Sequence, residues 1–96
     1  MNSISSIKET VSDLGKQYGA ERIYLFGSYA RGEATEQSDI DLRIDRGTIH
    51  GLQFAKFLGD LEDKLGKNVD LISTAGMDKD FLSGIKNEEI LLYERQ

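Results

Sequence analysis

Two aspartates separated by a single residue carry the strongest chemical signal in the sequence. Asp39 and Asp41 open a stretch, residues 39–45, in which charged and apolar residues alternate strictly. Such alternation is typical of a half-buried strand, so both carboxylates are expected on one face with their Cα atoms about 6.6 Å apart. Metal pairs that assist phosphoryl transfer stand about 3.5–4 Å apart. The two carboxylates can bracket such a pair, and Mg²⁺ suits these oxygen ligands.

Gly27 and Ser28 are candidates for binding phosphate. The apolar run before them, within residues 22–26, is too short for a helix and predicts a buried strand. Glycine lets the backbone approach a phosphate closely, and the free amides that open a helical turn are hydrogen-bond donors, as is the Ser28 hydroxyl. Arg31, one turn later, can reach a phosphate or hold the loop to a carboxylate. We therefore predict a phosphate-binding loop beside the aspartate pair.

Asp70 is a candidate third carboxylate. It lies between Val69 and Leu71 in a segment, residues 68–73, that predicts a strand. If both neighbours are buried, Asp70 points to the opposite face and can join the pair. There it can bind one metal and accept the proton of an attacking hydroxyl as a general base. An aspartate near the start of a strand is also often a local cap, and this alternative remains open.

Three amphipathic helices are expected to support these strands, because apolar residues recur at three- and four-residue spacing. They cover residues 3–18, 50–65 and 78–89. The second helix is expected to face the core through Leu52, Ala55, Leu58, Leu61 and Leu65, with Phe54 and Phe57 flanking this stripe. The third is expected to turn Phe81, Leu82 and Ile85 inward. Ser3 is a suitable N-cap for the first helix, and Gly19 and Gly66 are suitable C-terminal stops.

The order of the elements predicts an α/β (α+β) fold in one domain, residues 1–96. A helical turn is expected at 28–31, a loop at 32–38 and a short edge strand at 90–93. Together with the helices and strands above, these make a small mixed sheet of three to four strands with helices packed on it. A chain of 96 residues is too short for a second domain that would hold an acceptor.

Charge and composition exclude several classes of protein. The 12 basic and 17 acidic residues give a net charge of −5, and there is no Lys/Arg run, so direct nucleic-acid binding is not expected. An acidic surface suits a basic protein partner. The absence of cysteine excludes disulfides and thiolate metal sites. No apolar stretch approaches the roughly 18 residues of a membrane-spanning helix, and no secretory pattern is present, so we expect a cytoplasmic location.

Other candidates receive ordinary structural interpretations. Asp45 is expected to be a surface charge, and His50, the only histidine, a surface or capping residue. Tyr24, Phe26 and Tyr29 belong either to the core or to an apolar patch for a partner. Glycines 27 and 32 have the spacing of a P-loop, but the Lys-Ser/Thr that must follow is absent.

The spacing as a whole resembles a known signature. Gly-Ser, then ten residues, then Asp-x-Asp is similar to the motif of the DNA polymerase β-like nucleotidyltransferase superfamily. The fuller forms, Gly-Ser-x-Ala-Arg-Gly at 27–32 and Ser-Asp-x-Asp-Leu at 38–42, resemble its minimal nucleotidyltransferase (MNT) branch. The likeness covers nearly the whole chain, since Asp70 and the terminal Leu-Tyr-Glu at 92–94 also fall where that branch would place them.

This resemblance implies a nucleotidyltransferase fold, a substrate and a set of roles. Asp39 and Asp41 would bind two Mg²⁺ ions, while Asp70 would bind one of them and assist deprotonation. The triphosphate of ATP would lie on the nucleotide-binding segment, whose candidate ligands are Gly27, Ser28, Arg31 and Ser38. An acceptor hydroxyl would attack the α-phosphate in line, and pyrophosphate would leave.

The resemblance also implies a partner. Stand-alone MNT proteins of this size look like the antitoxin half of prokaryotic toxin–antitoxin pairs, in which a HEPN-type ribonuclease is the toxin. The antitoxin would adenylylate a tyrosine of that toxin with ATP, within a hetero-oligomer. Two alternatives stay open. One is a non-catalytic antitoxin that neutralises its partner by occlusion, and the other is a small-molecule nucleotidyltransferase, for example one that modifies an antibiotic.

Overall fold

Four strands form one open sheet in the computed structural model, which describes residues 2–96. Their order across the sheet is β3–β2–β1–β4. The strands are β1 Arg22–Phe26, β2 Ile40–Asp45, β3 Val69–Ser73 and β4 Ile90–Glu94. β1 is antiparallel to both of its neighbours, whereas β2 and β3 are parallel. The predicted mixed sheet is therefore confirmed, with four strands.

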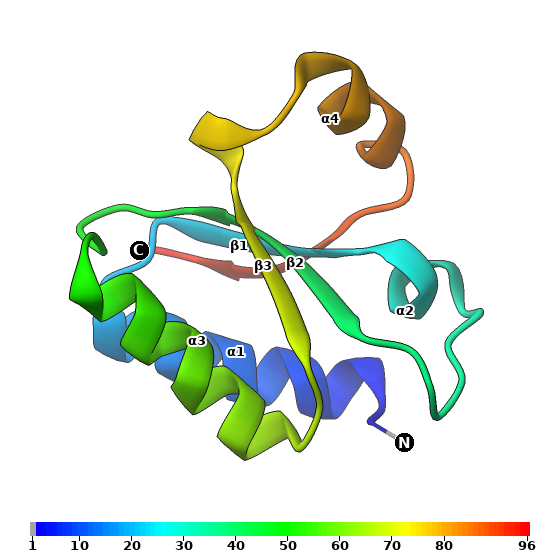
Figure 1. The fold of residues 1–96 in the computed structure, drawn as a ribbon, viewed down its shortest axis with the longest axis horizontal. Coiled ribbons are helices and arrows are strands. Elements are labelled where there is room, and N and C mark those ends of the chain that lie inside the picture. Colours follow the sequence, from blue (N-terminus) through cyan, green and yellow to red (C-terminus); the bar gives the residue numbers. More distant parts are fainter. Residues whose placement is uncertain (1) are drawn as a thin grey trace.

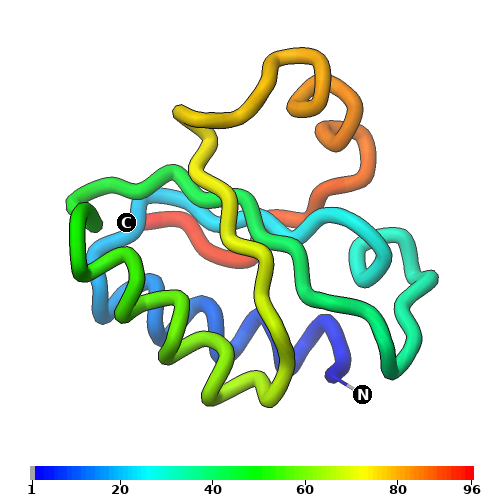
Figure 2. Tube along the Cα trace, in the orientation of Figure 1, coloured from blue at the N-terminus to red at the C-terminus, as the bar shows by residue number. Residues whose placement is uncertain are grey.

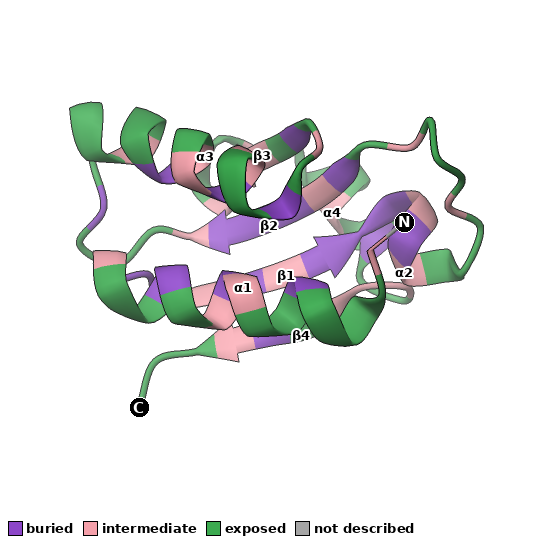
Figure 3. Ribbon diagram, turned by 90° about the horizontal axis from the view of Figure 1, so that it is seen from below, coloured by how far each residue is buried: buried purple, intermediate pink, exposed green. Residues whose placement is uncertain are grey.

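Two long helices cover one face of this sheet, and a short helix stands over the other (Figure 1). The helices are α1 Ile4–Tyr18, α2 Gly27–Arg31, α3 Leu52–Leu65 and α4 Lys79–Ile85, with a 3₁₀ turn at Thr74–Gly76. α1 and α3 turn their buried sides toward the strands and their exposed sides outward (Figure 3). α2 directly continues β1. Within residues 2–96 no helix combines the length and apolar character needed to cross a membrane.

The alternation in β2 divides the sheet into a core face and a polar face. Ile40, Leu42 and Ile44 are fully buried against α1 and α3. Asp41 and Arg43 therefore point to the other face, as the two-residue period of a strand requires. The sequence predicted this division correctly, and it places the candidate site on the face that the long helices leave open.

The ends of α1 follow the expected capping chemistry. Ser3 caps the helix by accepting a hydrogen bond from the backbone N–H of Ser6 at 3.1 Å. Gly19 ends it in the left-handed region with a φ of 85°, a conformation that favours glycine. Gly66 ends α3 in the same way, so all three capping predictions are confirmed.

The buried side of α3 differs from the predicted one. The helix begins at Leu52 rather than at His50, and Leu52 is 90% exposed. Phe57, expected to flank the stripe, is instead its fully buried centre. Two stripes on this helix have helical spacing, and the one that contains the aromatic rings buries more apolar surface. The observed stripe is Phe54, Phe57, Leu58, Leu61 and Leu65.

α4 is shorter than predicted, and its apolar side is less buried. It ends at Ile85, because the Ile85 carbonyl accepts hydrogen bonds from the N–H groups of both Glu88 and Glu89 in a turn. Ile85 is buried as expected, but Phe81 is 45% exposed, so the prediction that Phe81 faces inward is wrong. The turn directs the chain into β4.

The last strand brings the end of the chain back to the sheet, where β4 forms the edge next to β1. β4, red in Figure 2, runs beside β1 although more than sixty residues separate them in sequence. The register pairs Leu25 with Ile90, near the end of β1 and at the start of β4. The residues just before Ile90 therefore lie beside Gly27, where β1 passes into α2.

Candidate active site

The strand register brings two of the three candidate carboxylates side by side. Asp41 pairs with Asp70 across the parallel β2–β3 ladder and with Phe26 on the other side. Asp39 directly precedes β2, two residues from Asp41. Val69 is buried and Asp70 exposed, so Asp70 points away from the core as predicted. The fold thus gathers all three aspartates beside the end of β1.

The electrostatics of this group favour a cation. Burial raises the pKa of Asp41 to about 6, with smaller contributions from the charges of Asp70 and Asp39, while Arg31 acts in the opposite direction. Like charges held together disfavour ionisation, and a bound cation removes that cost. The donor chemistry therefore fits Mg²⁺, which takes carboxylate oxygens as ligands.

The three aspartates are neighbours, but their carboxylates do not surround a single point at which a metal ion could bind. Between residues 2 and 96 no group of three His, Cys, Asp or Glu side chains is already arranged to hold a metal ion. Asp39 and Asp70 are exposed, so their side chains are free to rotate toward an ion. A metal site would therefore form when the exposed carboxylates of Asp39 and Asp70 turn toward the partly buried carboxylate of Asp41.

Gly27 makes room for the Asp41 carboxylate. Its φ is 75°, in the left-handed region, and a Cβ atom built on it would lie 2.2 Å from Oδ2 of Asp41. Any other residue at this position would therefore be strained and would displace the carboxylate. The sequence predicted a close approach of the Gly27 backbone to a phosphate, and the structure adds this contact with the aspartate pair.

The Gly27 amide and Arg31 converge on one carboxylate that sequence reasoning did not select, that of Glu88. The Gly27 N–H donates to Oε2 of Glu88 at 2.8 Å, and Nη1 of Arg31 donates to the same oxygen at 3.1 Å. Arg31 also donates from Nε to Glu33 at 2.9 Å. Of its two predicted roles, Arg31 here shows the second, holding its loop to carboxylates. No local pattern in the sequence singles out Glu88, which lies in the turn between α4 and β4.

The two candidate serines have different surroundings. Ser28 lies in the first turn of α2, where its carbonyl accepts a hydrogen bond from the Glu33 N–H at 2.9 Å. The Ser38 hydroxyl accepts from the Thr35 N–H at 2.9 Å, so Ser38 shapes the loop that delivers Asp39. Nucleotide binding by either serine stays a prediction.

Arg43, on the same face of β2 as Asp41, holds the segment that carries Glu88. Its guanidinium forms two hydrogen bonds with the carboxylate of Glu89, at 2.7 and 3.0 Å, and a third with the Thr74 hydroxyl at 3.0 Å. It also lies 4.0 Å from the centre of the Tyr24 ring. This buried, bidentate pair fixes the entry to β4, and no periodic pattern in the sequence indicates it.

The remaining charged candidates are structural. Asp45 forms ion pairs with Arg22 at 3.6 Å and with Arg43 at 3.8 Å, so it is more than a free surface charge. His50 is exposed, and its Nδ1 lies 2.8 Å from the Thr48 carbonyl oxygen, which agrees with the surface interpretation.

The aromatic candidates separate into core and polar-face residues. Tyr29, 4% exposed, belongs to the hydrophobic core, whereas Phe26, 5% exposed, is buried on the polar face, where it pairs with Asp41 across the β1–β2 ladder. Tyr24 is half-buried beneath the Arg43 guanidinium. The edge of the Phe26 ring contacts Phe81, with 5.9 Å between ring centres, and so joins α4 to the sheet.

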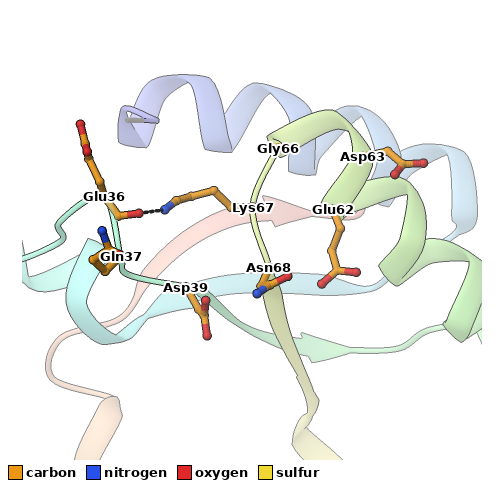
Figure 4. A pocket seen from close by; sticks show the side chains of 8 residues that line it. All are labelled: Glu36, Gln37, Asp39, Glu62, Asp63, Gly66, Lys67 and Asn68. Atoms are coloured by element: carbon orange, nitrogen blue, oxygen red, sulfur yellow. Dashed lines mark hydrogen bonds between the residues drawn. The ribbon is translucent and has the colours of Figure 1, made fainter.

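An acidic groove borders the site at Asp39 (Figure 4). Its volume is about 510 Å³, and its carboxylates are those of Glu36, Asp39, Glu62 and Asp63. Lys67, the one basic residue of its lining, donates to the backbone carbonyl of Glu36 at 2.7 Å. Neither Gly27 nor Asp41 lines the groove, and its acidity disfavours a triphosphate. The Gly27 side of the aspartates is the better match for phosphate.

Comparison with known proteins identifies the family. The profile of the family described as "Polymerase beta, Nucleotidyltransferase" matches residues 8–96. A Methanocaldococcus jannaschii protein with the provisional name protein adenylyltransferase is 35% identical over 98 residues, which cover 95% of this chain and 98% of the relative. Protein adenylyltransferase MntA of Thermococcus cleftensis is 39% identical over 66 residues, covering 68% of this chain and 67% of MntA.

Solved structures share the fold. One provisionally described as a minimal nucleotidyltransferase has a TM-score of 0.79 and 35% identity, and the match covers 91% of this chain and 90% of that one. A toxin–antitoxin crystal structure with AMP-PNP has a TM-score of 0.78 at 23% identity, covering 93% of this chain and 74% of that one. The predicted nucleotidyltransferase fold is thereby confirmed, and the chain belongs to the polymerase β nucleotidyltransferase family.

Proposed function

We propose that this chain is a Mg²⁺-dependent protein adenylyltransferase that moves AMP from ATP to a hydroxyl of a partner protein. The observation that carries the proposal is the pairing of Asp41 with Asp70, with Asp39 two residues away and Gly27 in contact range of Asp41. The names of the relatives, protein adenylyltransferases in both cases, support the same activity.

The carboxylates would share two ions. Asp39 and Asp41 would bind both, and Asp70 would bind one. The ions would neutralise the phosphates and the charge that develops during transfer. The raised pKa of Asp41 supports this assignment, because it reflects a partly buried carboxylate beside the charges of Asp70 and Asp39, which a bound cation would offset.

The protein's own groups would position ATP and move one proton. The Gly27 N–H, the Ser28 hydroxyl and the Arg31 guanidinium would bind the phosphates. A bond forms between the acceptor oxygen and the α-phosphorus while the bond to pyrophosphate breaks, and the acceptor proton passes to the Asp70 carboxylate. Positioning and electrostatic stabilisation would supply most of the rate. Ser38 would contribute by shaping the loop before Asp39.

The acceptor we propose is a HEPN-type toxin, with this chain as its antitoxin in a hetero-oligomer. Support comes from the relative MntA and from a toxin–antitoxin structure of MntA that is 25% identical with a TM-score of 0.69. The net charge of −5 suits a basic partner surface. Since ATP and the RNA that such a toxin cleaves are both cytoplasmic, we place the pair in the cytoplasm.

A growth assay separates this proposal from neutralisation by occlusion. The chain would be co-expressed with the HEPN-type toxin proposed as its partner, as wild type, as Asp41→Ala and as Asp13→Ala, an exposed carboxylate on α1. We expect Asp41→Ala to lose protection at normal protein levels and Asp13→Ala to keep it. Protection by Asp41→Ala equal to that of wild type would favour occlusion and contradict a catalytic antitoxin.

A further inference from the structure

One carboxylate, that of Glu88, already binds the two hydrogen-bond donors that lie beside the three aspartates. Oε2 of Glu88 accepts hydrogen bonds from the Gly27 N–H at 2.8 Å and from Nη1 of Arg31 at 3.1 Å. Its other oxygen lies 3.4 Å from the same guanidinium nitrogen. A backbone amide and an arginine that converge on one anionic oxygen form the arrangement that binds a phosphate oxygen equally well.

Glu88 and a phosphate cannot both use these donors. The Gly27 amide has one hydrogen, and a short hydrogen bond to Glu88 already uses it. Glu88 also places a negative charge near Asp41, whose pKa it helps to raise. A triphosphate brought to Gly27 would meet this charge at close range, so its binding requires the Glu88 side chain to move away.

The surroundings of Glu88 allow that movement. Its side chain is 23% exposed and can rotate toward water. The next residue, Glu89, is 10% exposed and is held by Arg43 through two hydrogen bonds. The backbone before β4 is thus anchored at Glu89, while the Glu88 side chain is free to exchange its partners. Glu33, the other carboxylate on Arg31, does not contact Gly27 and offers a matched comparison.

We propose that Glu88 is a residue of the nucleotide site, which binds the Gly27 amide and Arg31 and exchanges places with a phosphate group of ATP. This inference rests on the proposed function, because it takes Gly27 and Arg31 as ligands of the triphosphate. Glu88 thereby lowers the affinity for ATP. A purely structural Glu88 would have the opposite effect, since its removal would disorder the phosphate donors and weaken binding.

The test is the affinity for ATP of the wild type and three variants, Glu88→Gln, Glu88→Ala and Glu33→Gln. Binding of ATP with Mg²⁺, and of inorganic triphosphate as a second probe, would be followed by calorimetry and by the amide resonance of Gly27, without any partner protein. Thermal unfolding would verify that each variant folds. The two substitutions at Glu88 keep the proposal testable if one of them does not fold.

We expect removal of the Glu88 charge to tighten ATP binding about tenfold, the scale of one charge-assisted hydrogen bond. Glu33→Gln, which removes an exposed partner of Arg31, should change it less than about twofold. Equal or weaker binding by folded Glu88 variants would overturn the proposal, as would a complete absence of ATP binding. Tighter binding without AMP transfer to any partner would leave this proposal standing and contradict the proposed function instead.

Discussion

At the scale of single residues, Gly27 links the two halves of the proposed site. Its amide is one of the proposed phosphate donors, and its missing side chain leaves the space that the Asp41 carboxylate occupies. In the proposed function, this one residue would set the distance between the nucleotide and the metal ligands.

Gly27→Ala is predicted to damage transfer far more than Gly32→Ala. Both glycines have φ values near 75°, so each substitution should lower the free energy of unfolding by about 1–3 kcal/mol. Only at Gly27 would the new Cβ atom strike a functional group, Oδ2 of Asp41, whereas open space surrounds Gly32. Displacement of that carboxylate should lower the transfer rate about 100-fold. Equal rates for the two variants in a labelled-ATP assay would contradict this role of Gly27.

The raised pKa of Asp41 predicts a pH-dependent cost to stability. The pKa is 3.8 in the unfolded chain and about 6 in the fold, so the folded state binds more protons between these values. The free energy of unfolding that Asp41 contributes therefore falls as pH rises from about 4 to about 6. Asp41→Asn should be more stable than wild type at pH 8, and this advantage should vanish below pH 4.

Urea unfolding in EDTA at pH 3.5, 6 and 8 would measure this effect, with Asp13→Asn as the control for loss of an exposed carboxylate. A stability difference between Asp41→Asn and wild type that is the same at all three pH values would show that Asp41 is not held in an unfavourable charged state.

At the scale of the elements, α3 shows which of two helical stripes is buried. Phe57→Ala should lower the free energy of unfolding by about 3–5 kcal/mol, because the ring is fully buried. Leu52→Ala should change it by less than about 0.5 kcal/mol, because Leu52 is 90% exposed. Chemical denaturation of both variants tests this. A large loss of unfolding free energy in Leu52→Ala would instead indicate that the stripe predicted from the sequence is the buried one.

The Arg43–Glu89 pair is predicted to fasten α4 and β4 to the sheet. Both side chains are nearly buried, at 7% and 10% exposure, so Glu89→Ala leaves an uncompensated buried charge and should cost about 3–5 kcal/mol. Glu33→Ala, which breaks an exposed pair with Arg31, should cost less than about 1 kcal/mol. A double-mutant cycle on Arg43 and Glu89, followed by urea unfolding, measures the coupling energy of the pair. A small coupling energy would show that the pair is dispensable and would contradict this prediction.

Much of this architecture could be predicted, because local patterns determine it. The alternation at residues 39–45 fixed the face of Asp41, and β1 was predicted with its observed bounds. The stripe of α3 could not be chosen, because burial depends on which ring finds space in the core. Glu88 and Arg43 were missed because their contacts join residues 31 to 61 positions apart, and no periodic pattern in the sequence reveals contacts at such separations.

At the scale of the whole molecule, topology creates the site. The antiparallel return of β4 beside β1 brings Glu88 to Gly27, and the parallel β2–β3 pair brings Asp70 to Asp41. α1 and α3 cover the opposite face and α4 stands over the polar face (Figure 1), on which Asp39 and Asp70 remain exposed. In the proposed function these groups would bind the nucleotide donor, and we expect a partner protein to supply the acceptor.

The most direct test of this account is transfer of label from α-³²P-ATP to the HEPN-type toxin proposed as the partner, in the presence of Mg²⁺. The account predicts labelled toxin with the wild type and with Asp13→Ala, and none with Asp39→Ala or Asp41→Ala. Absence of label with the wild type, or undiminished label with folded Asp39→Ala and Asp41→Ala, would contradict it.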